Sequence, residues 1–217
     1  DTNQELINFY ETAQNHFVDL EKHIRITLHS RRMFTDASVV YNNPHMFTRI
    51  QRAWAVWTLA AQGFAGMLDG SWGYDKGKST TSKKIQNKKD LFTEDLAARL
   101  QDVQIECTDA LRIINSRDTE DSFFYCDPPY FNSDCGHYDG YSQDDFENLL
   151  KILSEIKGRF LLSSYPSELL SKYVSSEGWH QHTVESSVSV ANNTGKRKVK
   201  TEVMTANYDL SNPKQKL

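Results

Sequence analysis

The first 62 residues contain no glycine, although the chain of 217 residues has ten glycines in all. Glycine allows backbone conformations and close backbone approaches that other residues resist, which is why tight cofactor-binding turns depend on it. A glycine-rich ligand loop is therefore excluded from residues 1–62.

Long apolar runs are also missing. The longest largely apolar run covers residues 53–61 and includes Thr58, whereas a membrane span needs roughly 20 apolar residues. We therefore expect no transmembrane helix. The first thirty residues carry acidic side chains at amphipathic positions, among them Glu5 and Glu11, a pattern that differs from those of signal and transit peptides.

Cysteine is scarce as well. Cys107, Cys126 and Cys135 are odd in number and lack a C-x-x-C spacing, so they indicate neither a disulfide framework nor a structural zinc site. A reducing cytoplasm is the compartment that this usage favours.

The formal net charge of −4 argues against a protein that coats nucleic acid without selection. Positive charge is nevertheless concentrated in residues 76–89 and 196–200, on an otherwise acidic chain. These segments predict phosphate contacts confined to one face, and a solvated lysine-rich loop is the alternative for either segment. The candidate DNA-contacting residues are Lys76, Lys78, Lys83, Lys84, Lys196, Arg197 and Lys198.

The amino-terminal third has the apolar spacing of amphipathic helices. Residues 3–28, for which a break near His23 is the alternative, and residues 44–62 are expected to be helical. Trp54 and Trp57 are expected in the core rather than stacked on bases. The connection between the two helices is left unassigned. Residues 63–89, rich in glycine, serine, threonine and lysine, predict a mobile loop or hairpin.

Strand and helix patterns alternate after residue 90, which predicts an α/β fold with a mainly parallel, helix-covered sheet and a final antiparallel hairpin. One of the strands, at 122–126, is expected to be buried. The predicted strands are 103–106, 122–126, 159–163, 179–190 and 201–210, and the predicted helices are 93–100, 110–115, 143–156 and 166–173.

The sharpest motif follows the strand predicted at 122–126. Asp127, Pro128, Pro129 and Tyr130 come directly after its apolar residues, and open α/β sheets bind ligands at the carboxyl ends of their strands. The two prolines stiffen the backbone and have no amide hydrogen, so the loop offers hydrogen-bond acceptors rather than donors. It therefore suits a substrate that bears an amino group.

This motif resembles the catalytic motif of S-adenosylmethionine-dependent amino methyltransferases, and its surroundings resemble the Dam-type adenine DNA methyltransferases. Residues 1–10 resemble the acidic segment after the second strand of that fold, and residues 63–75 resemble a DNA-contacting hairpin. Residues 193–208 resemble its last loop and strands.

The resemblance implies a Rossmann-like methyltransferase sheet with helices on both faces and a carboxy-terminal antiparallel hairpin, plus a small helical DNA-recognition subdomain. The catalytic domain is expected to comprise residues 1–10 and 91–217, and the helical target-recognition region, with its Gly/Lys-rich hairpin, residues 11–90. The family also implies double-stranded DNA as partner, a monomer, no membrane, and the cytoplasm and nucleoid of a bacterial or phage-infected cell, in some cases within a restriction-modification system.

The resemblance also implies roles for individual residues. Asp127 and the Pro128 carbonyl would accept the two hydrogens of the adenine 6-amino group, while Tyr130 stacks on a base flipped out of the duplex. Asp1 would hold the ribose of S-adenosylmethionine, Asp109 would lie near its adenine, and Asp127 would also face this cofactor. No metal is implied. For Asp1 and for Asp109, a helix cap is the alternative.

One feature of the family is missing: the Phe-x-Gly-x-Gly turn of the first strand, since no glycine precedes Gly63. Three explanations are open, namely an omitted amino-terminal segment, a natural truncation, or a complementing chain that supplies the missing half-site. The leading hypothesis is an adenine DNA methyltransferase, and the alternative is a catalytically silent DNA-binding remnant or one half of a split enzyme. An RNA or protein amino methyltransferase is disfavoured, because protein-glutamine enzymes carry Asn at the position of Asp127.

Overall fold

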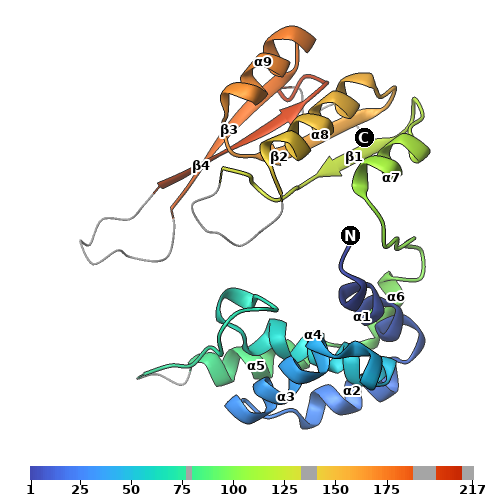
Figure 1. The fold of residues 1–217 in the computed structure, drawn as a ribbon, viewed down its shortest axis with the longest axis vertical. Coiled ribbons are helices and arrows are strands. Elements are labelled where there is room, and N and C mark those ends of the chain that lie inside the picture. Colours follow the sequence, from blue (N-terminus) through green and yellow to red (C-terminus); the bar gives the residue numbers. More distant parts are fainter. Residues whose placement is uncertain (77–79, 133–140, 188–198, 212–217) are drawn as a thin grey trace. The chain divides into compact units, whose positions relative to one another are not determined.

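The computed structural model describes residues 1–76, 80–132, 141–187 and 199–211 (Figure 1). The chain forms two compact units, residues 1–109 and 110–217. Residues 1–10 and 91–109 thus pack with the helical first unit, whereas the sequence analysis grouped them with residues 110–217 in one catalytic domain. The assignment of target recognition and catalysis to separate regions of the chain stays a prediction.

The first unit begins with four helices joined by short connections. Residues 3–28 do not form one helix, because His16 is non-helical at φ −136° and separates two segments. Residues 44–62 are also divided, since only a 3₁₀ turn follows Pro44 and the main helix starts after a capping box formed by Thr48 and Gln51. The helices are α1 (Gln4–Asn15), α2 (Phe17–Ile26), α3 (Arg31–Asn42) and α4 (Arg49–Gln62), and the turn is η1 (Pro44–Met46).

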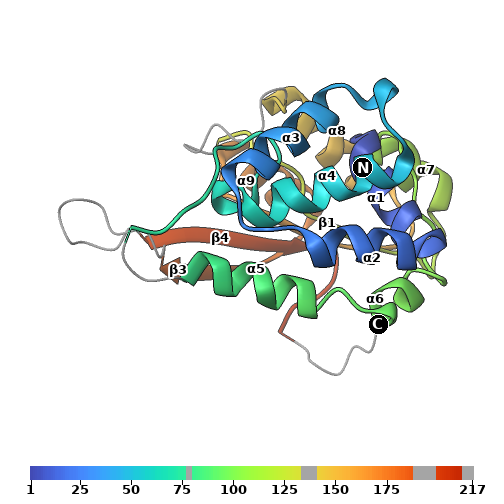
Figure 2. The ribbon, with the colours of Figure 1, turned by 90° about the horizontal axis from the view of Figure 1, so that it is seen from below.

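Helix α4 lies at the centre of this group and contacts α1, α2 and α3 (Figure 2). Trp57 on α4 is buried, and the half-buried Trp54 donates its indole N–H to the Thr27 hydroxyl at 2.8 Å. The expectation that both tryptophans belong to the core is therefore confirmed. The unassigned connection contains α3, whose Phe34 and Ala37 pack against Leu59.

A buried polar side chain, Gln62 at the end of α4, joins three segments of the first unit. Its amide nitrogen donates to the Leu28 carbonyl at 2.9 Å, and its amide oxygen accepts from the Ser30 backbone at 3.1 Å and the Trp72 indole at 3.2 Å. Gly63 then bridges to Trp72 in antiparallel fashion. A Cβ atom at Gly63 would lie 2.5 Å from the Met67 carbonyl oxygen, so the turn requires glycine there.

The segment expected to be a loop ends in a helix, α5 (Thr80–Asp90), so that part of the prediction is wrong. Ile85 is buried on α5 and joins Phe92 in the core formed with α2 and α4, which explains why this polar segment folds. Asp75 accepts hydrogen bonds from the Thr81 backbone and the Thr80 hydroxyl, and the Thr81 bond lowers the pKa of Asp75. The first unit also contains η2 (Phe64–Gly66) and α6 (Glu94–Arg99).

The described residues of the second unit form a four-stranded sheet in the order β1-β2-β4-β3 and three helices. Strands β1 and β2 are parallel, whereas β4 is antiparallel to both β2 and β3. The final hairpin is confirmed, but a mainly parallel sheet is not what the described strands form. The elements are α7 (Ala110–Arg117), β1 (Phe123–Cys126), α8 (Gln143–Glu155), β2 (Arg159–Ser164), α9 (Glu168–Glu177), β3 (His180–Ser187) and β4 (Val199–Ala206).

Two strand predictions are wrong. Residues 103–106 form no strand, and β1 is not buried, since Phe123 is 38% and Tyr125 58% exposed. The two corrections have different causes. The backbone of Glu106 and Thr108 bonds to Asp1 rather than to a strand of the sheet. In the described sheet β1 pairs with β2 alone and therefore lies exposed at the edge.

The core of the second unit lies between the sheet and its helices. Phe160 and Leu162 of β2 pack against α8 and α9, with Phe146 and Leu150 among the fully buried side chains. Asn207, the residue after β4, links the end of that strand to the start of β2. Its side chain accepts from the Phe160 backbone at 3.1 Å and donates to the Gly158 carbonyl at 2.9 Å.

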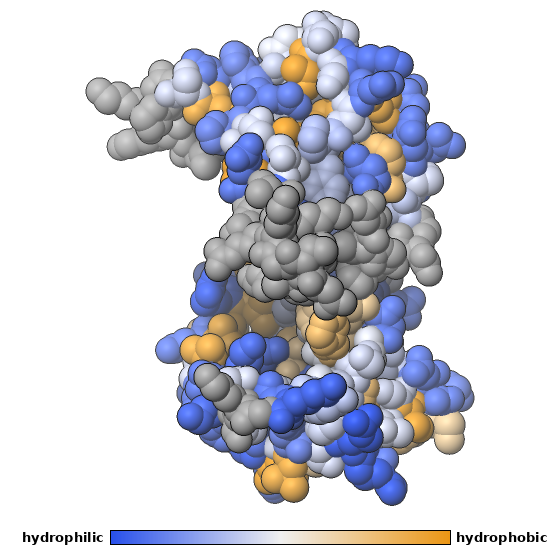
Figure 3. Space-filling view, turned by 90° about the vertical axis from the view of Figure 1, so that its left-hand side faces the viewer, coloured by the Kyte–Doolittle hydropathy of each residue, from blue (hydrophilic) through white to orange (hydrophobic). Residues whose placement is uncertain are grey.

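Among the described residues, no helix has the length and apolar character needed to cross a lipid bilayer. Mostly hydrophilic residues cover the face of each unit drawn in Figure 3, with small separate hydrophobic patches.

Replacing Gln62 should destabilise the first unit. Gln62→Leu leaves two part-buried donors and one carbonyl without their partner, which we expect to cost about 2–4 kcal/mol of the free energy of unfolding. Urea unfolding of this variant and of Gln101→Leu, at an exposed position, provides the comparison. Equal unfolding midpoints for the two variants would contradict the role given to Gln62.

Candidate active site

The motif identified in the sequence lies where two parallel strands end side by side. Cys126, the last residue of β1, pairs with Leu162 of β2, so residues 127–130 leave β1 beside the end of β2. Asp127 is exposed, whereas Pro128, Pro129 and Tyr130 are half-buried. The structure thus places all four predicted catalytic residues in one loop at the carboxyl edge of the sheet.

Tyr130 is held by hydrogen bonds from both sides. Its hydroxyl donates to Asp127 Oδ1 at 3.3 Å and lies 2.7 Å from Ser163 Oγ on β2. A phenol has one hydrogen, so when Tyr130 donates to Asp127 the Ser163 hydroxyl donates to Tyr130.

The surroundings of Tyr130 keep its phenol protonated at neutral pH. Burial is the largest effect and raises the pKa of Tyr130, and the negative charges of Asp127 and Glu202 raise it further. The hydrogen bond from Ser163 acts in the opposite direction and lowers it. Tyr130 is therefore a neutral aromatic surface beside an exposed carboxylate.

Aromatic and basic groups extend the site along β2 and β4. The Tyr165 ring meets the Tyr130 ring edge-on, with centroids 4.5 Å apart, and Lys200 Nζ lies 5.5 Å from the Tyr165 centroid. Lys200 belongs to the basic segment 196–200, so the described end of that segment reaches the site.

The loop that carries the motif is also anchored beyond Tyr130. Phe131 packs against Phe146 of α8 with centroids 5.2 Å apart, and Asn132 donates to the Pro166 carbonyl at 3.2 Å. Cys126, just before the motif, is shielded from solvent, and burial raises the pKa of its thiol to about 11. Cys126 is thus a structural residue rather than a nucleophile.

Sequence reasoning missed Ser163 and Tyr165 as residues near the motif, whereas Lys200 belongs to the predicted basic segment 196–200. Ser163 and Tyr165 stand in the run Ser163-Ser164-Tyr165-Pro166, which follows the apolar residues of β2 just as Asp127 follows β1. A polar and aromatic run at the carboxyl end of a neighbouring parallel strand is the signal that identifies them.

The candidate cofactor residues Asp1 and Asp109 lie in the first unit. The Asp1 carbonyl accepts from the Thr108 backbone at 3.0 Å, so residues 1–2 run beside residues 106–108. The Asp1 carboxylate accepts from the Asn3 backbone at 2.8 Å and remains exposed, as does Asp109. The two carboxylates thus belong to neighbouring stretches of chain, and both can accept hydrogen bonds. Asp127, the third candidate, belongs to the second unit.

The predicted DNA-contacting residues divide into two groups. Lys76, Lys83 and Lys84 are exposed, whereas Lys78, Lys196, Arg197 and Lys198 lie outside the described residues. Two further lysines of the same basic segment, Lys88 and Lys89, donate to the carbonyls of Ala60 and Arg25, and burial lowers the pKa of both.

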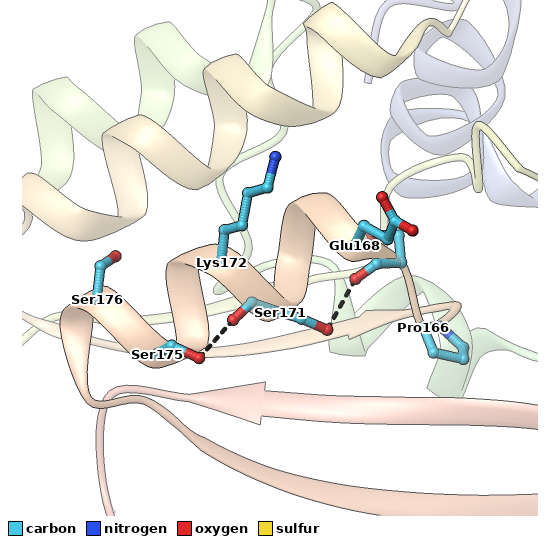
Figure 4. Close-up of a pocket in the computed structure, with 7 residues that line it drawn as sticks. Pro166, Glu168, Ser171, Lys172, Ser175 and Ser176 are labelled. Carbon is cyan, nitrogen blue, oxygen red and sulfur yellow. Dashed lines mark hydrogen bonds between the residues drawn. The ribbon is translucent and has the colours of Figure 1, made fainter.

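A hollow along α9, drawn in Figure 4, does not provide a second candidate. Its Ser171 and Ser175 hydroxyls donate to backbone carbonyls of their own helix, at Ser167 and Ser171. These two hydroxyls therefore already donate hydrogen bonds within the protein and are not free to donate to a ligand.

Comparison with known proteins identifies the class of this chain. Residues 1–188 match the family model for D12 class N6 adenine-specific DNA methyltransferases. The chain belongs to this family, so it is an adenine-specific DNA methyltransferase, and the resemblance noted in its sequence is confirmed. No curated protein matches the sequence.

Removing the Ser163 hydroxyl should affect Tyr130 in two measurable ways. Ser163→Ala deletes the bond that lowers the pKa of Tyr130, so that pKa should rise, and the half-buried phenol oxygen loses a partner at a cost of about 1 kcal/mol. Ultraviolet titration, with Tyr130→Phe subtracted, measures the pKa, and urea unfolding measures the stability.

Ser164→Ala is the matched control, because the Ser164 hydroxyl is buried without a hydrogen-bond partner among the described atoms. It should leave the pKa of Tyr130 unchanged and cost less stability than Ser163→Ala. Identical behaviour of the two variants would refute the support given to Tyr130 by Ser163.

Proposed function

We propose that the protein transfers a methyl group from S-adenosyl-L-methionine to the exocyclic 6-amino group of an adenine flipped out of double-stranded DNA. The observation that carries this proposal is the loop of residues 127–130, which presents an exposed carboxylate beside a neutral tyrosine ring. Family membership supports adenine in DNA as the target.

The amino nitrogen of adenine is a weak nucleophile because its lone pair is delocalised into the ring. Asp127 and the Pro128 carbonyl would accept its two hydrogens and thereby localise the lone pair on nitrogen. Tyr130 would stack on the base and fix its orientation, since Ser163 holds the phenol at the carboxyl edge of the sheet. The contribution of these residues is positioning and electrostatics, which is how a protein assists a group transfer whose reactive centre belongs to the cofactor.

S-adenosylmethionine supplies an electrophilic methyl group when bound. Asp1 would hold the ribose of the cofactor, and Asp109 would lie near its adenine. Their carboxylates can accept hydrogen bonds from hydroxyl and amino groups. Asp127, on the catalytic loop, is assigned to both the target base and the cofactor. We propose that these residues form part of a Rossmann-like methyltransferase domain with helices on both faces of the sheet.

Target recognition is assigned to residues 11–90, the helices and the Gly/Lys-rich segment of the first unit. Extrusion of a base costs a few kcal/mol of stacking, and contacts to the surrounding duplex must supply that energy. The exposed ammonium groups of Lys76, Lys83 and Lys84 are suited to phosphate contacts. Lys78, Lys196, Arg197 and Lys198 remain candidates for the same role, and we propose that the enzyme acts as a monomer.

The assignment of Asp127 is tested by methyl transfer. The natural gene product, incubated with labelled S-adenosylmethionine and unmethylated duplex DNA, should transfer the label, and Asp127→Ala should lower the rate about 100-fold or more. Asp121→Ala removes an exposed carboxylate outside the motif and should leave the rate unchanged. Equal transfer by Asp127→Ala would overturn the site, and no transfer by the natural protein would favour a silent DNA-binding remnant.

The phosphate contacts are tested by the salt dependence of DNA binding. The double variant Lys83→Gln, Lys84→Gln should weaken binding equally for all sequences and lower the slope of log K against log salt concentration by about two. Lys151→Gln combined with Lys172→Gln makes the same charge change at exposed positions of the second unit, outside the proposed recognition region. If both double variants give the same slope, these two lysines do not contact DNA.

A further inference from the structure

An arginine in the first unit lies over a stack of aromatic rings that the proposed mechanism does not use. The Trp72 and Tyr74 rings are stacked with centroids 5.6 Å apart and an interplanar angle of 17°. Arg31 Cζ lies 4.6 Å from the Trp72 centroid and 5.7 Å from the Tyr74 centroid. The guanidinium is therefore held by cation–π contacts with two rings.

The ring stack is fixed to the rest of the unit. The His29 ring lies 4.8 Å from the Trp72 ring, and His29 Nε2 is 2.9 Å from the Gly73 carbonyl oxygen. Buried Gln62 ties Trp72 to the backbone of Ser30, the residue before Arg31. The arginine and its aromatic support are thus set by one hydrogen-bond network.

Arg31 also differs from other arginines of this unit in its charge partners. Arg25, Arg32, Arg49 and Arg52 each pair with a carboxylate, whereas the ion pairs found among the described residues include neither Arg31 nor Arg99. Of these two arginines, Arg31 is the one that lies over aromatic rings. Its side chain is exposed, and Tyr74 beneath it is 55% exposed. An arginine on the face of a ring keeps the N–H groups at its own edge available for a planar acceptor pair.

We propose that Arg31 reads a guanine in the DNA target, donating to O6 and N7 from its position over Trp72 and Tyr74. This inference rests on the proposed function, in which residues 11–90 recognise DNA. A base edge requires a donor pair of fixed direction, and rings that restrict the guanidinium provide it. A phosphate needs only a nearby positive charge, which the flexible lysines of α5 already supply.

Selection of DNA by binding tests this assignment without requiring methyl transfer. The natural gene product should enrich a motif that contains a G·C pair from a pool of randomised duplexes. Arg31→Lys keeps the charge but loses the planar donor pair, so its preference for guanine at one position should fall about 10-fold. Arg32→Lys changes the neighbouring exposed arginine, which pairs with Asp36, and should enrich the original motif.

Two results would overturn the assignment. One is a natural protein that enriches no motif. The other is an Arg31→Lys variant that keeps the guanine preference, with or without a uniform loss of affinity, because a uniform loss indicates a phosphate contact. Methyl transfer is measured separately on the same preparations, so an enriched motif without transfer would contradict the proposed function while supporting the role of Arg31.

Discussion

The hydrogen bond between Tyr130 and Ser163 is the contact on which the candidate active site depends. Two consecutive prolines make the loop after β1 stiff, but stiffness alone does not set its direction. Ser163 ties the far end of this loop to β2, at 2.7 Å from the Tyr130 hydroxyl. The carboxylate, the proline carbonyls and the tyrosine ring consequently keep fixed relative positions, as the capture of a planar amino group requires.

In the first unit, too, a hydrogen-bonding side chain on a regular element holds a loop in place. Gln62 is buried and satisfies hydrogen-bonding groups from two distant segments, and it thereby holds Trp72 beside the residues that lead into α3. In each unit, one polar side chain on a regular element fixes a loop that carries aromatic groups. Such contacts are costly to leave unmade in a buried setting, which makes the loop geometry specific.

Local sequence features predicted local structure well. The loop of residues 127–130 could be located because these residues are consecutive, and the amphipathic helices because their spacing is regular. The break lies at His16 rather than near His23, because the apolar spacing continues across His16 and does not mark it. The strand expected at 103–106 was wrong because residues such as Val103 and Ile105 express only a preference, and the backbone of Glu106 bonds to Asp1 rather than to a strand. The contact of Ser163 with Tyr130 and that of Arg31 with Trp72 were missed because both join distant segments.

Identification of the modified base tests the central claim most directly. Unmethylated duplex DNA is incubated with the natural gene product and S-adenosylmethionine, digested to nucleosides and analysed by mass spectrometry. The account predicts N6-methyl-2′-deoxyadenosine, formed in proportion to enzyme and at a rate lower by about 100-fold or more when Asp127 is replaced by alanine. A methylated cytosine, or no methylated nucleoside at all, would contradict it.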